Sequence, residues 1–414
     1  MTSVLNPELK KWLRLSLLNL LIVAFAGIIQ RYKIAFPLPF IDQRNLMHAH
    51  SHLAFAGWIT QALMALMVNY LYNNSMPGAF GKYKWILWAN LISAWGMFVT
   101  FANGGFDFLS HTFSGLNVIV FYIFAVMYWI DLGRMKEKNI IHHWFKAALV
   151  FSCFSYLGGL ALGVMLATKV MHQMWFLGAV YFFMHFQYNG WFFFALMGLL
   201  MEKFLLKSIN PNSLKIIFIM FAIACVPTYF LSALWIPVPR WTYWLMVLSA
   251  AAQLIGWIWI VNIIRKNISE LTQNMSSLGK WLIILPLFAL LVKFLLQFSA
   301  THPALTRIAY EFHSIVIGFL HLVFLAITSL FILGYIVNNH LLNISKAAAR
   351  GIIIFTLGII INELILMSQG IAALFFKTIP GSNVYLLGAA VIMFSGVLLI
   401  NLSQKTSIIK SPAN

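Results

Sequence analysis

Long apolar segments follow one another along the whole chain, with short loops between them. The first, residues 13–30, comes close to the 20 or so apolar residues that a helix needs to cross a bilayer. Of the 414 residues, 62% are hydrophobic and only 9% are charged. Soluble domains carry about 25% charged residues. The pattern therefore predicts an all-α polytopic membrane protein.

We expect about twelve transmembrane helices, packed as one bundle in a single domain of residues 1–414. No soluble domain, convincing repeat or low-complexity linker interrupts the series. The first segment lacks a small-residue cleavage site, which favours a retained helix over a signal peptide. The expected helices cover roughly residues 13–30, 48–72, 85–102, 113–129, 146–168, 174–201, 214–236, 241–264, 281–298, 308–336, 351–374 and 383–402.

The net charge of +18 suggests a nucleic-acid partner at first sight, but the positions of the basic residues indicate a membrane topology instead. When the loops are assigned alternately to two sides, most of the 27 Lys and Arg residues fall on one side. Cytoplasmic loops carry such an excess of basic residues. We therefore predict cytoplasmic N- and C-termini, a multi-pass location in the inner (cytoplasmic) membrane, the lipid bilayer as a partner, and no nucleic acid.

Cysteine offers little for binding a cofactor. Cys153 and Cys225 both lie within apolar segments, and the chain has no CxxCH motif for covalent haem attachment. Any cofactor must therefore be held mainly by histidine.

Three alternating histidines, His48, His50 and His52, open the segment 48–72 near its outer end. At about 100° per residue, His48 and His52 share a helix face and His50 points roughly opposite. Together with His313, near the outer end of segment 308–336, they are candidates to bind a b-type haem, because haem iron accepts imidazole. The alternative is that such histidines cap helix ends or form local hydrogen bonds.

His313 and His321 lie eight residues apart, which places them about 80° apart around the helix and roughly 12 Å apart along it. One planar macrocycle cannot be ligated by both. We therefore expect His321 to belong to a second site.

Polar residues also occur deep in other segments. His185 lies in a polar-aromatic cluster with Gln187, Tyr188 and Asn189, which is either an interhelical hydrogen-bond network or a site for a ligand or a proton. Lys293 and Glu363 fall at equal depth, so we expect a buried ion pair, which is either structural or part of a proton path.

Two of these stretches resemble the haem–copper oxidase subunit I superfamily, which includes nitric oxide reductases. HSHLAFAGW is similar to that family's H-x-(N/H)-L-x-x-x-G-W pattern and points to His50, with His52 as its neighbour. HFQYNGWFFFALMGL is similar to the family's helix 6, which implies a metal-ligand position for His185. The resemblance implies a low-spin haem near the outer face and a second metal near His185 and His321.

The chain also departs from the family pattern. Segment 214–236 has no histidine, whereas the family has a pair of metal ligands in its helix 7. The stretch HSIVIGFLH places its histidines eight positions apart, whereas one residue separates the two haem ligands of the family. We expect a divergent member without an intact haem–copper centre.

Three functions follow as hypotheses. The first is a haem-binding protein for electron transfer or small redox-ligand handling, with a respiratory-chain or other redox partner; any reaction would be an oxidoreduction. The second is a proton-coupled transporter or metal permease that uses Lys293, Glu363 and His185, although the chain shows no inverted repeat. The third is a structural or assembly partner of a respiratory complex.

Overall fold

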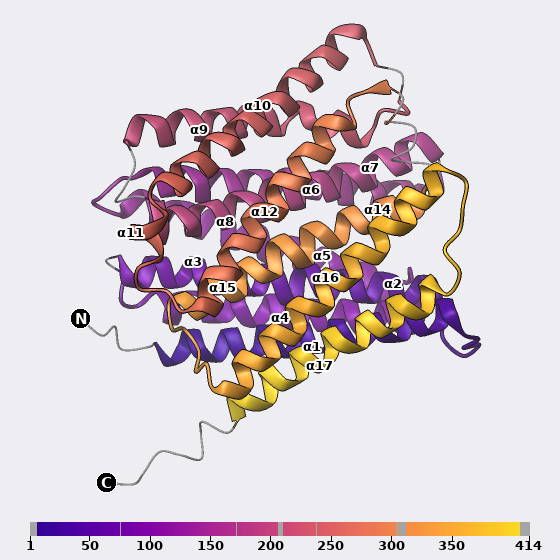
Figure 1. Ribbon diagram of the computed structural model, residues 1–414, viewed down its shortest axis with the longest axis horizontal. Coiled ribbons are helices and arrows are strands. Elements are labelled where there is room, and N and C mark those ends of the chain that lie inside the picture. The colour runs from indigo at the N-terminus through magenta and orange to yellow at the C-terminus, as the bar shows by residue number, and fades with distance from the viewer. Residues whose placement is uncertain are drawn as a thin grey trace. The chain divides into compact units, whose positions relative to one another are not determined.

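The computed structural model describes residues 6–74, 76–170, 172–205, 210–236, 238–303, 305 and 312–405, apart from the side chains of residues 204, 205, 313 and 405. Every regular element within these ranges is a helix (Figure 1). The contacts divide the chain into two compact units. Unit 1 comprises Met1–Phe124, Ser276–Leu282 and Ser329–Asn414, and unit 2 comprises Ala125–Met275 and Ile283–Thr328.

Within the described ranges, ten helices are long and apolar enough to cross a membrane. This confirms the prediction of a helical, multi-pass membrane protein; the expected total of about twelve and the cytoplasmic termini stay predictions. The ten are Pro7–Ala35 (α1), Gln43–Asn73, Ala79–Gly104 (α4), Phe108–Arg134 (α5), Ile140–Thr168 (α6), Arg240–Lys266 (α10), Ser277–Ser299 (α12), Ser314–Asn338, Lys346–Leu374 (α16) and Ser382–Gln404, which is the greater part of α17 (Ser382–Lys405).

The segment predicted at 174–201 is one continuous helical run of changing geometry. It consists of α7 (Gln173–His185), the π-helix η2 (Phe186–Phe192), α8 (Phe193–Leu200) and the π-helix η3 (Met201–Leu205). Single π-turns inside α-helices are rare and are frequent at functional sites. The π-helix η2 therefore marks its own residues, and His185 directly before it, as candidates for a functional site.

The segment predicted at 214–236 differs from the observed element. The helix α9 (Pro211–Cys225) ends early, and a 3₁₀ helix, η4 (Pro227–Ser232), follows it. Pro227 has no N–H group, and in an α-helix its ring would clash with the carbonyl one turn back, which disfavours continuation of the α-helix at this point.

Several helices begin earlier than the apolar pattern predicts, because polar residues cap them. The Asp42 side chain accepts a hydrogen bond from Asn45 N at 2.8 Å, so that helix α2 (Gln43–His52) starts before the histidines. Asp107 acts in the same way ahead of α5, where its Oδ1 accepts from Ser110 N at 2.7 Å. This backbone hydrogen bond lowers the pKa of the Asp107 carboxyl below its usual value.

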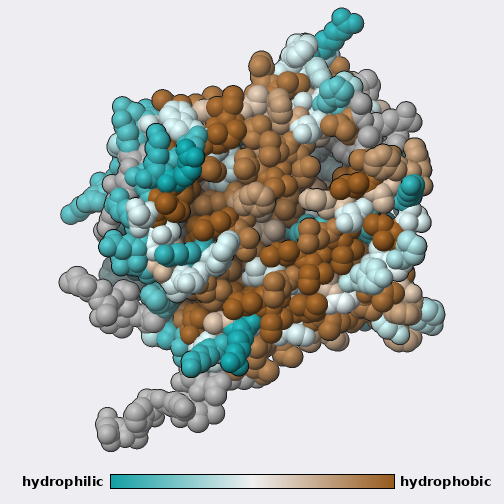
Figure 2. Space-filling model, viewed as in Figure 1, coloured by the Kyte–Doolittle hydropathy of each residue, from teal (hydrophilic) through white to brown (hydrophobic). Residues whose placement is uncertain are grey.

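In unit 1, α16 and α17 pack so closely that their backbones touch. A Cβ atom on Gly351 would lie 2.8 Å from the Gly396 carbonyl oxygen, and one on Gly358 would lie 2.9 Å from Met393 N. Small residues permit this approach in membrane helix pairs. Asn401 of α17 donates to the Leu17 carbonyl of α1 at 3.1 Å. The visible outer faces of α16 and α17 are mostly hydrophobic, as a lipid-facing surface requires (Figure 2).

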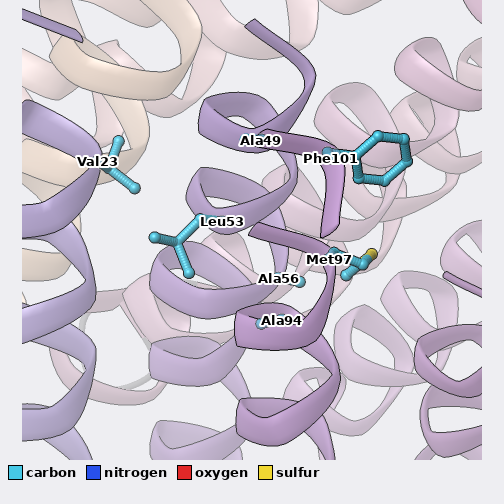
Figure 3. Packing of buried hydrophobic residues seen from close by; sticks show 7 residues of the cluster. All are labelled: Val23, Ala49, Leu53, Ala56, Ala94, Met97 and Phe101. Carbon is cyan, nitrogen blue, oxygen red and sulfur yellow. The ribbon is translucent and has the colours of Figure 1, made fainter. Parts of the chain in front are cut away.

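A buried apolar cluster of unit 1 includes Ala49, the residue between His48 and His50 in α2. It joins α1, α2, the following π-helix η1 (Leu53–Thr60) and α4 (Figure 3). Its small residues let α2 and α4 approach one another closely. The members are Val23, Ala49, Leu53, Ala56, Ala94, Met97 and Phe101.

Glycines also set the packing of unit 2. A Cβ atom on Gly158 of α6 would lie 2.6 Å from the Ala179 carbonyl oxygen and 2.9 Å from Phe183 N, so that α6 and α7 are in backbone contact. Gly190 of η2 leaves room for the Phe151 side chain of α6 in the same way. These contacts fix the helical run that carries His185 against α6.

Candidate functional site

The three histidines of α2 divide between two helix faces, as the sequence predicts. The His48 and His52 rings lie against Phe101 of α4, with ring centroids 6.0 Å and 4.5 Å from it. His50 lies on the other side of α2, where its Nδ1 is 3.0 Å from the Val23 carbonyl oxygen of α1. The three imidazoles therefore belong to two different environments.

The hydrogen bond of His50 determines which ring nitrogen carries the proton. A carbonyl oxygen can only accept, so Nδ1 must be the donor, and Nε2 keeps its lone pair in the neutral ring. Metal-ligating histidines usually show this arrangement, with one nitrogen held by a carbonyl and the other on the metal. Gly27 of α1 lies beside the ring, since a Cβ atom there would make an ordinary van der Waals contact with His50 Cε1 at 3.5 Å.

Arg31, one turn beyond Gly27 on α1, supplies a positive charge to this region. Its guanidinium acts electrostatically on both His50 and Glu363 of α16. Glu363 Oε1 also accepts a hydrogen bond from Asn362 Nδ2 at 3.1 Å. The sequence pairs Glu363 with Lys293, but Lys293 belongs to unit 2 and Glu363 to unit 1. That pairing stays a prediction, and Arg31 is a charged neighbour that the sequence did not reveal.

His185, in unit 2, uses both of its ring nitrogens within the protein. Nε2 lies 2.9 Å from the Cys225 carbonyl oxygen, which makes Nε2 the donor, and Nδ1 then accepts from Asn189 Nδ2 at 3.0 Å. The ring is fully buried. A metal at His185, as the resemblance implies, would have to displace one of these two hydrogen bonds. As observed, the residue is a node of a hydrogen-bond network.

The network continues through α9 and into α10. The Cys225 thiol lies 3.6 Å from the Asn189 carbonyl, and Thr228 Oγ1 donates to the carbonyls of Ala224 and Cys225. Gln253 of α10 in turn donates to Thr228 Oγ1 at 3.4 Å. The residues of α9, η4 and α10 were not recognised from the sequence as neighbours of His185, because no local pattern encodes a contact forty residues away.

Lys293 is 2% exposed and lies between aromatic rings of unit 2. Its Nζ is 4.2 Å from the ring centroid of Phe294 and 5.7 Å from that of Phe193, which suits a cation. The side chain also lines a small cavity with Tyr188 and Thr328, in which the space open to the centre of a water molecule is about 10 Å³. That is close to the minimum that one enclosed water needs.

The two histidines of segment 308–336 are only partly described. The helix α14 (His313–His321) begins at His313, whose side chain lies outside the described residues. His321 lies at the other end of α14, and its Nδ1 donates to the Ile317 carbonyl at 2.8 Å. The two residues lie at opposite ends of α14, and their assignment to different sites stays a prediction.

Within the described part of the chain, no three His, Cys, Asp or Glu side chains gather so that they could hold a metal ion. A haem needs only one or two axial imidazoles, so this finding bears on multi-ligand metal sites alone. Comparison with known proteins adds no further constraint: no protein-family model matches the chain, and no curated protein sequence matches it.

Proposed function

We propose that this chain is a haem-binding integral membrane protein, a divergent relative of haem–copper oxidase subunit I, that serves electron transfer or the handling of a small redox ligand. The observation that carries the proposal is the His50 Nδ1–Val23 carbonyl hydrogen bond, which leaves Nε2 as a ligand. The same residue is the one to which the HSHLAFAGW stretch points.

His50 suits an axial ligand better than its two neighbours. Its ring orientation is fixed by the backbone of a second helix, where Nδ1 donates to the Val23 carbonyl and Gly27 lies in contact with the ring. His52 is stacked face to face on Phe101 at 4.5 Å, with an interplanar angle of 5°, so that its orientation is set by an aromatic ring alone. A fixed second nitrogen is what usually distinguishes a metal-binding imidazole.

His313 remains the proposed partner of His50 from the sequence alone. A b-type haem held by two such imidazoles would supply reversible one-electron transfer. The residues of this chain would hold and orient the group: His50 through its Nδ1 hydrogen bond, and Arg31 as a cation for an anionic side group of the macrocycle. The redox partner would be a respiratory-chain component of the inner membrane.

A reduced-minus-oxidised absorbance spectrum of full-length protein, purified in detergent from haem-replete cells, tests this proposal. We expect the bands of a b-type haem at close to one haem per chain. Protein without haem absorbance would overturn the proposal. The missing helix 7 histidines predict that no dinuclear oxygen- or nitric-oxide-reducing activity accompanies the spectrum.

A second candidate function, proton-coupled transport, rests on a different observation. Lys293 is an ionisable side chain buried beside a water-sized cavity, with Tyr188 and Thr328 in the same lining. Intramembrane ionisable residues often mark proton or substrate paths. In this alternative, Lys293 carries the proton, and Glu363 and His185 are further members of the path. Proton uptake into proteoliposomes under an imposed membrane potential, followed with an enclosed pH-sensitive dye, tests it.

A further inference from the structure

The His48–His52 pair stays unused when His50 is assigned to the haem. The two residues lie one helical turn apart on the same face of α2, and both rings lie against Phe101. Both side chains are half-buried, and among the described residues neither ring nitrogen has a hydrogen-bond partner. Two adjacent imidazoles thus have their lone pairs free for a ligand from solution.

Residues four apart on a helix have Cβ atoms about 5–6 Å apart, which lets both side chains reach one point. Two histidines at this spacing on one helix face bind zinc in metalloproteases of the HExxH type. Imidazole is a ligand that zinc, copper and nickel accept well, whereas calcium and magnesium prefer oxygen. The spacing and the donor type point to a transition metal.

The surroundings leave one side of the pair open. Phe101 covers one side at 3% exposure, and the edge of the Phe106 ring meets His48 at 4.5 Å. Arg44 lies over Phe106 at 5.6 Å, and its charge opposes a nearby cation. The Asp107 carboxylate is held by the Ser110 amide. The geometry therefore favours an exchangeable ion with water in its remaining positions over a closed structural site.

We propose that His48 and His52 together bind one divalent transition-metal ion, with Cu²⁺ bound more tightly than Ni²⁺ or Zn²⁺, as the general affinity order of nitrogen ligands requires. This site is separate from that of His50, which faces α1. Metal binding by His48 and His52 therefore does not depend on whether His50 binds a haem.

Titration of tag-free, full-length protein with Cu²⁺, followed by electron paramagnetic resonance and by calorimetry, tests the proposal. We expect one tight equivalent whose spectrum shows two nitrogen ligands. His48→Ala and His52→Ala should each weaken this equivalent by about tenfold or more, since even residues that only orient a ligand are worth about 10–100-fold. The double variant should lose the tight equivalent altogether, because neither imidazole ligand remains.

His172→Ala, which removes an exposed histidine elsewhere, is the matched control and should leave the tight equivalent unchanged. Elution volume and far-ultraviolet circular dichroism show whether each variant is folded, and His48→Gln and His52→Gln repeat the test with polar side chains. An unchanged tight equivalent in the folded single variants, or a tight equivalent that persists in the folded double variant, would overturn the proposal. The haem spectrum should be the same in all of these variants.

Discussion

His185 donates its Nε2 hydrogen to the backbone carbonyl of Cys225, 2.9 Å away and forty residues later in the chain. The bond ties the start of η2 to the end of α9, at the place where Pro227 stops the helix. Because Asn189 saturates the other nitrogen, the imidazole is neutral and has one tautomer. The geometry assigns His185 a structural role in unit 2.

Replacement of His185 by Ala should destabilise the protein. It leaves the Cys225 carbonyl without the ring as a donor and the Asn189 amide without an acceptor, and each buried polar group without a partner costs about 1–3 kcal/mol. Thermal unfolding in detergent should show a lower midpoint for His185→Ala. The copper and iron contents should equal those of the wild type, and a loss of metal in folded His185→Ala protein would show instead that the residue is a ligand.

Replacement of His50 by Ala should abolish the six-coordinate haem spectrum. The variant lacks the proposed Nε2 ligand, whereas His48→Ala and His52→Ala keep it and should retain the wild-type spectrum. The three variants differ in position by one helical turn, so they report on the ligand rather than on general damage to α2. If His50→Ala keeps the six-coordinate haem spectrum and His52→Ala loses it, the axial ligand is His52, on the other face of the helix.

Two glycines of α6 offer a matched test of the α6–α7 contact. Gly158→Ala should destabilise unit 2 by more than about 1 kcal/mol, because the new methyl group meets backbone atoms of α7 that cannot rotate away. Gly163→Ala, on the same helix, meets no atom within 4 Å and should be neutral or stabilising by up to about 1 kcal/mol, as Ala favours helix. Thermal unfolding of both variants checks this, and equal effects would contradict the close approach.

The helices were largely predictable from the sequence, because long uncharged apolar runs have few other structures available in a membrane. The ends of the helices were less predictable, because each depends on a single residue at the edge of an apolar run. Asp42 caps the start of α2, and Pro227 follows the end of α9. The opposed faces of His48 and His50 were predictable, since both lie before the π-helix η1 and follow the regular 100° spacing.

The partners of the candidate residues were not predictable in this way. The side chain of Cys225 gives no hint of its contact with His185, because the backbone carbonyl of Cys225 is the group that accepts the hydrogen bond. In the sequence, Arg31 served only as one of the basic residues that indicate the membrane topology. In the structure, its charge interacts electrostatically with both His50 and Glu363. Depth in the membrane suggested Lys293 as the partner of Glu363, but depth does not tell which helices are neighbours. Such pairs depend on helix packing, which a single sequence does not encode locally.

Replacement of Lys293 by Met distinguishes a structural lysine from a functional one. Met has a similar length, and among the described residues no carboxylate forms a salt bridge with Lys293, so that the replacement removes a buried charge and leaves no counter-charge behind. We therefore expect Lys293→Met to unfold at the same or a higher temperature. The exposed Lys136→Met should change the stability by less than about 0.5 kcal/mol.

The proteoliposome assay decides between the two candidate functions. If the protein conducts protons, Lys293→Met should lose proton uptake while it keeps its stability, and Lys136→Met should keep both. If the haem function is correct, Lys293→Met should keep the haem spectrum, because Lys293 is not one of the proposed axial ligands His50 and His313. A stable Lys293→Met protein with wild-type proton uptake would remove the transport alternative, since no other described residue lining the cavity beside Lys293 has a basic side chain.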